Sequence, residues 1–236
     1  MSKHLTALTG LAVMLTVAAG PVFAGDVVGT VNYTGKVPNL KPIAMNADPG
    51  CASKHKSPVA SEALVLGGGN TMANVMVRVK GPVKGSFPAP AKPVVIDQKG
   101  CQYIPHVLGI RVGQTLQLKN SDGLLHNVHA LPKVNTPFNM AMPANRTTAD
   151  TKFGKEEGMF LVKCDVHPWM AAYVGVFANP FYAVSGKDGK YKISGLPPGN
   201  YEIEAWHEKL GVKTAKVTVA ADKPAAANFS FAPPSK

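Results

Sequence analysis

Short runs in which hydrophobic and polar residues alternate recur along most of the chain, and turn-forming residues separate them. The clearest runs cover residues 26–33, 62–66, 74–80, 93–97, 115–120, 159–164, 172–177, 190–193, 201–207, 213–220 and 228–231. Alternation with a period of two, carried by β-branched and aromatic residues, is typical of half-buried strands. The spacing of an amphipathic helix is hard to find after residue 24. The pattern therefore predicts an all-β protein, built as a sandwich or barrel.

Turn signals indicate where one β unit ends and the next begins. The chain has 20 Pro and 23 Gly, so turn-forming residues are frequent. The predicted strands between them are nevertheless too apolar for a disordered polypeptide. Two turn signals, in residues 186–191 (GKDGKY) and 196–201 (LPPGNY), flank a short strand. We therefore expect a larger domain over residues 25–179 and a smaller β-sandwich domain over 180–236, packed together with almost no linker.

The N-terminus has the features of a secretory leader. Lys3 and His4 precede an apolar run of small residues, which ends in Val22-Phe23-Ala24. This order predicts a signal peptide over residues 1–24, cleaved after Ala24. The alternative is an uncleaved anchor, but the apolar run is shorter than the roughly 20 residues that span a bilayer. We expect a periplasmic or otherwise exported protein.

The charge balance is basic, with 25 Lys and Arg against 14 Asp and Glu and a formal net charge of +11. Export argues against a nucleic-acid partner. An acidic protein partner or an anionic surface fits this charge, and solubility alone is the simpler explanation. Once the leader is removed, we expect no association with a membrane.

Three cysteines leave one without a disulfide partner. Cys51 and Cys101 lie beside Gly-containing turns, whereas Cys164 is followed closely by His167 and Met170. We therefore expect a structural disulfide between Cys51 and Cys101, as an oxidising compartment allows, and a lone thiolate at Cys164. A metal site built on Cys51 and His55 is an alternative, but it lacks two further ligands.

Two short segments carry residues that bind metals. Residues 164–170 (CDVHPWM) supply Cys164, His167 and Met170, and the upstream HNVH begins with His126. In a sandwich, loops at the same end of the fold can bring such distant segments together. Two imidazoles and one thiolate, with a weak axial thioether, form the ligand set of a blue-copper electron-transfer site.

Other interpretations of these residues stay open from the sequence. One alternative is that Cys164 and His167 are a thiol nucleophile and its base. Another is that they belong to a structural zinc site, although methionine is a poor zinc ligand. His129 is an alternative first ligand to His126. Whether His106 or His129 approaches the metal is not decided by the sequence.

The C-x2-H-x2-M spacing and the HNVH segment resemble the cupredoxins, specifically their amicyanin/plastocyanin-like members. The resemblance covers residues 95–178 and implies a Greek-key β-sandwich with one type 1 copper ion, bound by His126, Cys164, His167 and Met170. It implies that Asn127 joins the two ligand segments by hydrogen bonds. It also implies that His167 lies near the surface, in an apolar docking patch with Pro168 and Trp169.

The C-terminal segment 181–208 resembles carboxypeptidase regulatory-like, transthyretin-like domains, on the pattern G-x-Y-x-I-x-G-L-P-P-G-x-Y. Bacterial proteins with this arrangement are often described as methylamine-utilisation proteins, a label that does not identify the partner of this chain.

Together these features predict an exported copper protein that carries single electrons between redox proteins, one a donor and one an acceptor. We do not expect an enzyme, because a copper oxidase or nitrite reductase needs a further copper bound by several more histidines. The chain has seven His, one of them in the leader. The alternative function is copper storage, delivery or sensing, with the C-terminal domain as a docking element.

Overall fold

The computed structural model describes residues 24–221 and 223–233, so the predicted signal peptide falls almost wholly outside the described residues. Within this part of the chain, no helix has both the length and the apolar character needed to cross a membrane. The described chain is almost entirely β, with one short helix, α1 (Pro49–Ala52), and one 3-10 turn (Gly68–Asn70). The predicted all-β architecture, a β-sandwich with a further β domain, is confirmed.

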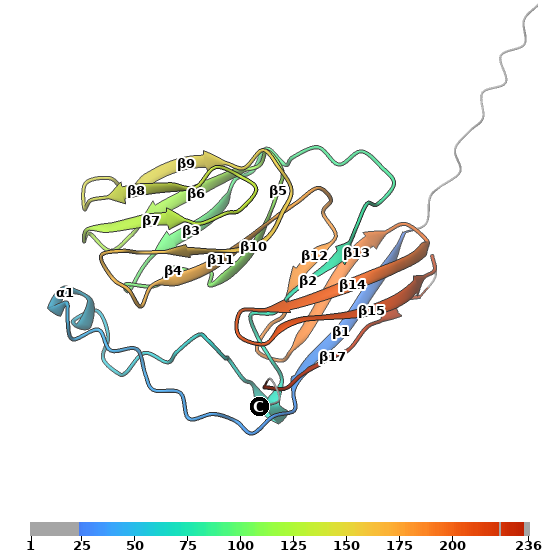
Figure 1. The fold of residues 1–236 in the computed structure, drawn as a ribbon, viewed down its shortest axis with the longest axis horizontal. Coiled ribbons are helices and arrows are strands. Elements are labelled where there is room, and N and C mark those ends of the chain that lie inside the picture. Colours follow the sequence, from blue (N-terminus) through green and yellow to red (C-terminus); the bar gives the residue numbers. More distant parts are fainter. Residues whose placement is uncertain (1–23, 222, 234–236) are drawn as a thin grey trace, which may run out of the picture.

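The first sandwich consists of two mixed sheets with the strand orders β5-β11-β10-β7-β8 and β4-β3-β6-β9 (Figure 1). Buried side chains of both sheets, such as Leu118 from β6 and Val174 from β11, share one core. The strands are β3 (Val94–Gln98), β4 (Tyr103–Ile104), β5 (Val107–Arg111), β6 (Thr115–Asn120), β7 (His126–Ala130), β8 (Phe138–Met142), β9 (Thr148–Lys152), β10 (Glu157–Lys163) and β11 (Ala171–Phe177).

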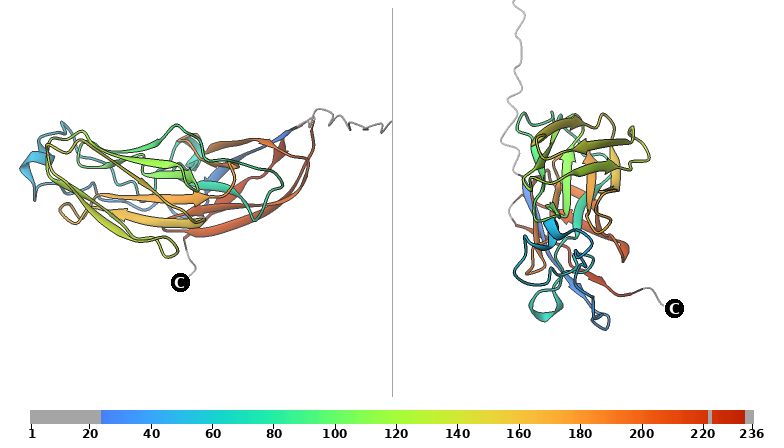
Figure 2. Two further views of the ribbon diagram at one scale, coloured as in Figure 1. Left: turned by 90° about the horizontal axis from the view of Figure 1, so that it is seen from above. Right: turned by 90° about the vertical axis from the view of Figure 1, so that its left-hand side faces the viewer.

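The second sandwich also has two sheets. In one, β1 pairs with β13, β16 and β17, and the other has the order β12-β2-β14-β15. The two sandwiches lie end to end along the long axis of the molecule (Figure 2). The strands are β1 (Gly25–Tyr33), β2 (Met76–Lys80), β12 (Tyr182–Val184), β13 (Lys190–Leu196), β14 (Gly199–His207), β15 (Gly211–Val219), β16 (Ala225–Ala226) and β17 (Phe229–Phe231).

The second sandwich takes strands from both ends of the chain, which differs from the predicted boundary near residue 180. Val27 and Val31 of β1 are fully buried in the same core as Phe229 and Phe231 of β17. β2 lies between β12 and β14. The first sandwich, residues 94–177, is therefore inserted between β2 and β12. The expected larger domain over residues 25–179 is therefore not one unit, because strand patterning does not reveal which strands pair.

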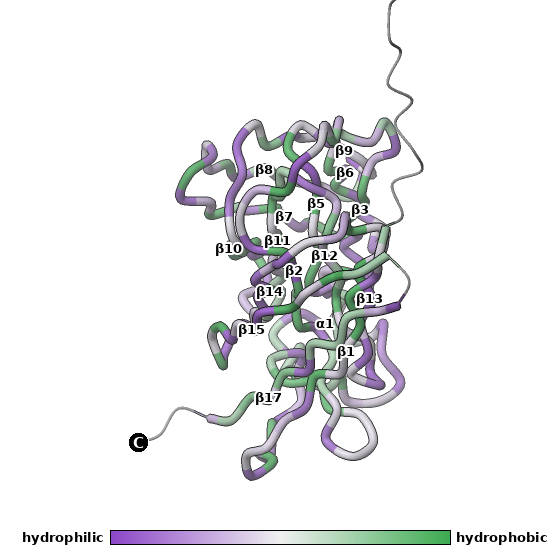
Figure 3. Tube along the Cα trace, turned by 90° about the vertical axis from the view of Figure 1, so that its right-hand side faces the viewer, coloured by the Kyte–Doolittle hydropathy of each residue, from purple (hydrophilic) through white to green (hydrophobic). Residues whose placement is uncertain are grey.

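Strand prediction was correct where alternation was strong and incomplete elsewhere. Hydrophobic positions are spread through the strands of both sandwiches (Figure 3). Residues 62–66 form no strand, and contribute only an isolated bridge between Leu66 and Met72. Strands β4, β5, β8, β9, β12 and β16 lie outside the predicted runs.

A long connection between β1 and β2 runs past the first sandwich and carries α1 to its far end (Figure 1). The predicted disulfide between Cys51 and Cys101 is present and joins this connection to the turn between β3 and β4. Met45 and Cys51 are buried in the core of the first sandwich. We call residues 45–55 the covering segment.

The contact between the two sandwiches is apolar with one buried ion pair. Met76, Val107 and Phe177 form its buried centre. Beside them, His106 Nε2 lies 2.6 Å from a carboxylate oxygen of Glu208, and both side chains are less than a tenth exposed. Since the other ring nitrogen lies 3.0 Å from the Ala171 carbonyl, both nitrogens face acceptors, as a protonated imidazole requires.

This ion pair predicts a pH-dependent stability. Burial alone lowers the pKa of His106, but the hydrogen bond to Glu208 and the charge of Glu62 outweigh it and raise that pKa. A raised pKa stabilises the fold below the unfolded value of about 6.5, and the contribution is lost as pH rises through the folded value. Glu208→Gln should therefore cost about 1.5–3 kcal/mol near pH 5.5 and clearly less near pH 9. Urea unfolding at both pH values measures this, and an equal loss at both would contradict it.

Candidate metal centre

Two neighbouring strands bring the ligand segments to one end of the first sandwich. His126 is the first residue of β7, and Cys164 follows the last residue of β10. β7 and β10 pair antiparallel, with His129 opposite Lys163, so the start of one strand meets the end of the other. Residues 164–170 then form a tight loop before β11. Pairing of strands therefore joins segments that are 38 residues apart.

Three predicted ligands converge at this end. The Nδ1 atoms of His126 and His167 lie 2.9 Å apart, and Cys164 Sγ lies 4.0 Å from the His167 Nδ1. One donor atom from each residue falls within 4.8 Å of the others. The three residues are 0%, 1% and 2% exposed for His126, Cys164 and His167, respectively. At 2.9 Å the two nitrogens can share one proton or one metal ion, and with Cys164 Sγ beside them they form a donor set that fits a metal ion.

Met170 lies at the end of the same loop. Its backbone N–H donates to the His167 carbonyl at 2.9 Å, and its carbonyl accepts from the Cys164 N–H at 3.2 Å. These two bonds close the loop on itself. The Met170 side chain is 1% exposed and belongs to the same core as Cys164, as an axial thioether beside the three donors would require.

Asn127 joins the two ligand segments. Its Oδ1 accepts from the Asp165 N–H at 2.7 Å and the Val166 N–H at 3.3 Å, and lies 3.2 Å from Cys164 Sγ. Its Nδ2 donates to Asn139 and Asp165. Because this side-chain amide both accepts and donates hydrogen bonds, it holds the start of β7 and the ligand loop together.

Two aspartates that the sequence analysis did not identify complete the cluster. Asp48 Oδ2 lies 2.8 Å from His167 Nε2, and Asp122 Oδ2 lies 3.0 Å from His126 Nε2. Each imidazole therefore points Nδ1 into the cluster and Nε2 at a carboxylate. Asp122 stands four residues before His126 on the same segment. Asp48 had no such link in the sequence, because it belongs to a distant segment.

The electrostatics of the cluster favour ionised thiolate and carboxylates. Burial raises the pKa of Cys164, but hydrogen bonds from His126 and from nearby backbone amides hold it below the ordinary value. Burial likewise opposes the protonated form of His126, yet Asp122 and Cys164 raise its pKa to about 9. The hydrogen bond to His167 is the main cause that lowers the pKa of Asp48. The anionic groups around the imidazoles thus stabilise positive charge in the cluster, whether a proton or a metal ion carries it.

The predicted exposure of His167 is wrong, because the covering segment lies over it. Besides Asp48, Cys51 Sγ lies 3.5 Å from His167 Nε2. Trp169 is half-buried, with its ring 5.1 Å from that of His167 and its Nε1 donating to the Cys101 carbonyl at 3.2 Å. Pro168 is exposed. Of the predicted docking patch, Pro168 and part of Trp169 are exposed, and His167 is not.

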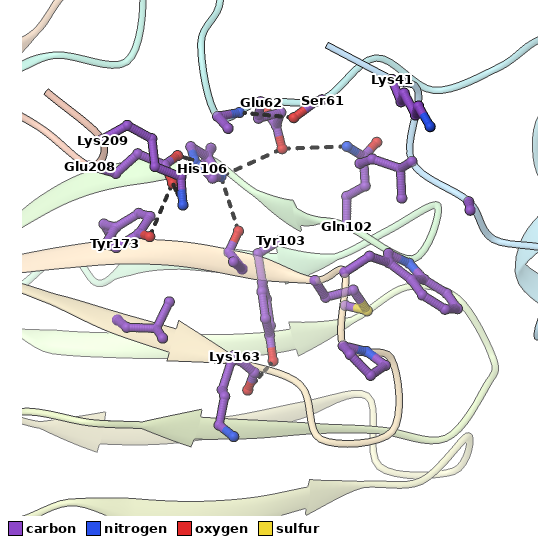
Figure 4. A pocket seen from close by; sticks show the side chains of 18 residues that line it. Lys41, Ser61, Glu62, Gln102, Tyr103, His106, Lys163, Tyr173, Glu208 and Lys209 are labelled. Atoms are coloured by element: carbon purple, nitrogen blue, oxygen red, sulfur yellow. Dashed lines mark hydrogen bonds and ion pairs between the residues drawn. The ribbon is translucent and has the colours of Figure 1, made fainter. Parts of the chain in front are cut away.

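The two undecided histidines lie outside the cluster. His129 Nδ1 is 2.9 Å from Asp165 Oδ2 at the surface, and His106 is engaged by Glu208. His106 does line a cavity of about 690 Å³ where the two sandwiches and the long connection meet. Its wall includes Tyr103, Trp169 and Met170, so the cavity borders the ligand loop (Figure 4).

Comparisons with known proteins find partial likenesses in structure. No protein-family model and no curated protein matches the sequence. A copper(I) form of an amicyanin variant aligns with 43% of this chain and 98% of its own, at 20% identity and a TM-score of 0.33. A reduced amicyanin variant aligns with 44% and 99%, at 22% identity and 0.33. The copper-containing nitrite reductase of Thermus scotoductus SA-01 aligns with 41% of this chain and only 25% of its own, at 23% identity and 0.34. TM-scores this low do not indicate a function, so only the geometry of the site bears on the function of this chain.

Proposed function

We propose that this chain is an exported type 1 copper protein of cupredoxin type that carries single electrons. His126, Cys164 and His167 would hold one copper ion, with Met170 as the axial thioether. The convergence of two Nδ1 atoms and one Sγ, all buried, is the observation that carries the proposal. A mixed nitrogen and sulfur set suits an ion that alternates between a soft reduced and a harder oxidised state.

The surroundings support rapid cycling at such a site. The closed loop from Cys164 to Met170 and the bonds of Asn127 hold the donors in one arrangement, and little reorganisation accompanies a change of charge when ligands are fixed. Redox proteins would be the donor and acceptor, and the net positive charge favours acidic ones. Pro168 and the accessible side of Trp169 would form their contact surface.

Replacing each of the two candidate histidines in turn tests whether His126 or His129 is the first copper ligand. His126→Gln removes one of two imidazoles and should abolish the intense visible thiolate-to-copper band of the Cu(II)-loaded protein. His129→Gln should leave the band unchanged, because His129 bonds Asp165 outside the cluster. Absorption spectra and copper content per chain measure both. If His129→Gln lost the band and His126→Gln kept it, the assignment would be reversed.

The burial of His167 favours one second function, in which the chain stores or delivers copper, since a covered ion exchanges electrons slowly. Voltammetry of the loaded protein separates the two functions. Reversible one-electron cycling supports the electron carrier, whereas tightly held Cu(I) with no reversible wave supports storage.

A further inference from the structure

The two half-cystines hold the two carboxylates that face the histidines. Asp48 Oδ1 accepts from the N–H groups of Gly50 and Cys51 at 2.7 and 3.2 Å, which leaves Oδ2 for His167. Asp122 accepts from the N–H groups of Gly100 and Cys101 at 2.6 and 2.8 Å. On each side of the disulfide, therefore, the N–H groups of a glycine and of the following half-cystine donate to one of these carboxylates, although Asp48 accepts both on Oδ1 and Asp122 accepts one on each oxygen.

The backbone on the Cys101 side is shaped for this contact. Gly100 and Cys101 have positive φ angles of 63° and 50°, a conformation that costs a non-glycine residue about 1 kcal/mol or more. It turns two successive N–H groups toward Asp122, whose side chain is 2% exposed. Lys54 of the covering segment adds an ammonium 3.5 Å from the same carboxylate. A buried carboxylate with this many donors has a fixed orientation.

The two contacts determine which ring nitrogen is free. An imidazole that donates its Nε2 proton to a carboxylate keeps the lone pair on Nδ1, and such partners orient metal-binding histidines and raise their basicity. Without the carboxylates, either nitrogen would carry the proton. The two Nδ1 atoms lie 2.9 Å apart beside Cys164, so once a metal ion has displaced the proton between the rings, these tautomers would present both Nδ1 lone pairs to it.

We propose that Asp48 and Asp122 are positioning residues that fix both imidazoles as Nδ1 ligands, and that the Cys51–Cys101 disulfide holds Asp48 over His167. The inference rests on the proposed function in that it concerns the same metal site. It assigns to the disulfide a role in metal affinity, in addition to its role in the fold.

Asp48→Asn is the discriminating variant, because an amide has only one oxygen. That oxygen would stay with the Gly50 and Cys51 N–H groups, and the NH₂ group would then face His167 Nε2. In the metal-free protein, His167 should therefore change from the Nε2–H to the Nδ1–H tautomer, which ¹⁵N NMR of labelled histidine detects. Affinity for Cu(I), measured by competition with a chelator, should fall roughly 10–100-fold. Asp48→Ala should lose affinity similarly and lose the slowly exchanging Nε2–H resonance.

The control is Asp150→Asn on β9, which removes an exposed carboxylate of the same sandwich and should change neither readout. If Asp48 served only to cap α1, Asp48→Asn would keep the wild-type tautomer and affinity, which would overturn the inference. The NMR readout needs no metal. If the wild type failed to bind copper, the proposed function would fail, while the tautomer of His167 would still decide the inference.

The contribution of the disulfide is tested by combining its removal with Asp48→Ala and asking whether the two losses of Cu(I) affinity add. Cys51→Ser with Cys101→Ser should free the covering segment and reproduce the loss seen in Asp48→Ala. Adding Asp48→Ala to that pair should then cost little more, because both changes remove the same contact. Full additivity would show that the disulfide acts independently of Asp48, and would overturn this part. The Asp48→Asn result stands even if the serine pair folds poorly.

Discussion

Replacing Cys164 with serine is expected to abolish the intense visible band of the copper-loaded protein. The band requires charge transfer from a thiolate, and a hydroxyl group in its place stays protonated. Cys164 is 1% exposed, and the hydrogen bonds that lower the pKa of its thiol favour the anion that the metal needs. No other free cysteine is found in the described residues, so none can replace it.

The matched control is Val166→Ala, in the same loop. Val166 is 45% exposed and takes part in the cluster only through its backbone N–H, which alanine keeps. The spectrum of this variant should equal that of the wild type. A band that persisted in Cys164→Ser would place the chromophore elsewhere.

Replacing Phe231 with alanine is expected to have the largest effect on stability. Phe231 is fully buried, and it pairs with Tyr33 where β17 runs parallel to β1. Removing a buried phenyl ring costs about 3–5 kcal/mol. The loss should appear as a lower urea midpoint, while the visible band of the loaded protein stays unchanged because the ring belongs to the second sandwich.

Ser230→Ala is the control on the same strand. Ser230 is exposed, and its replacement should stay within about 0.5 kcal/mol of the wild type. A cost below about 1 kcal/mol for Phe231→Ala would contradict the packing of the two chain ends into one core.

Features that depend on neighbouring residues were accessible from the sequence. Alternation revealed the strands with regular patterning, such as β6 and β10. The spacing of Cys164, His167 and Met170 on one short loop suggested a metal site, because a loop of this length keeps its donors together whatever the rest of the fold does. The pairing of Cys51 with Cys101 followed from the surroundings of the third cysteine.

Features that depend on distant segments were not accessible. Nothing in residues 25–33 indicates that they pair with strands from the other end of the chain. Asp48 caps α1 in the structure, and its contact with His167 depends on the disulfide that joins this segment to the turn beside the ligand loop. For the same reason, the burial of His167 contradicted an expectation taken from resemblance alone.

The most direct test of the copper site is X-ray absorption at the copper edge of the loaded wild-type protein. We predict one short sulfur neighbour and two imidazole nitrogens, with the sulfur lost in Cys164→Ser. Copper surrounded only by nitrogen and oxygen in the wild type would contradict the central claim.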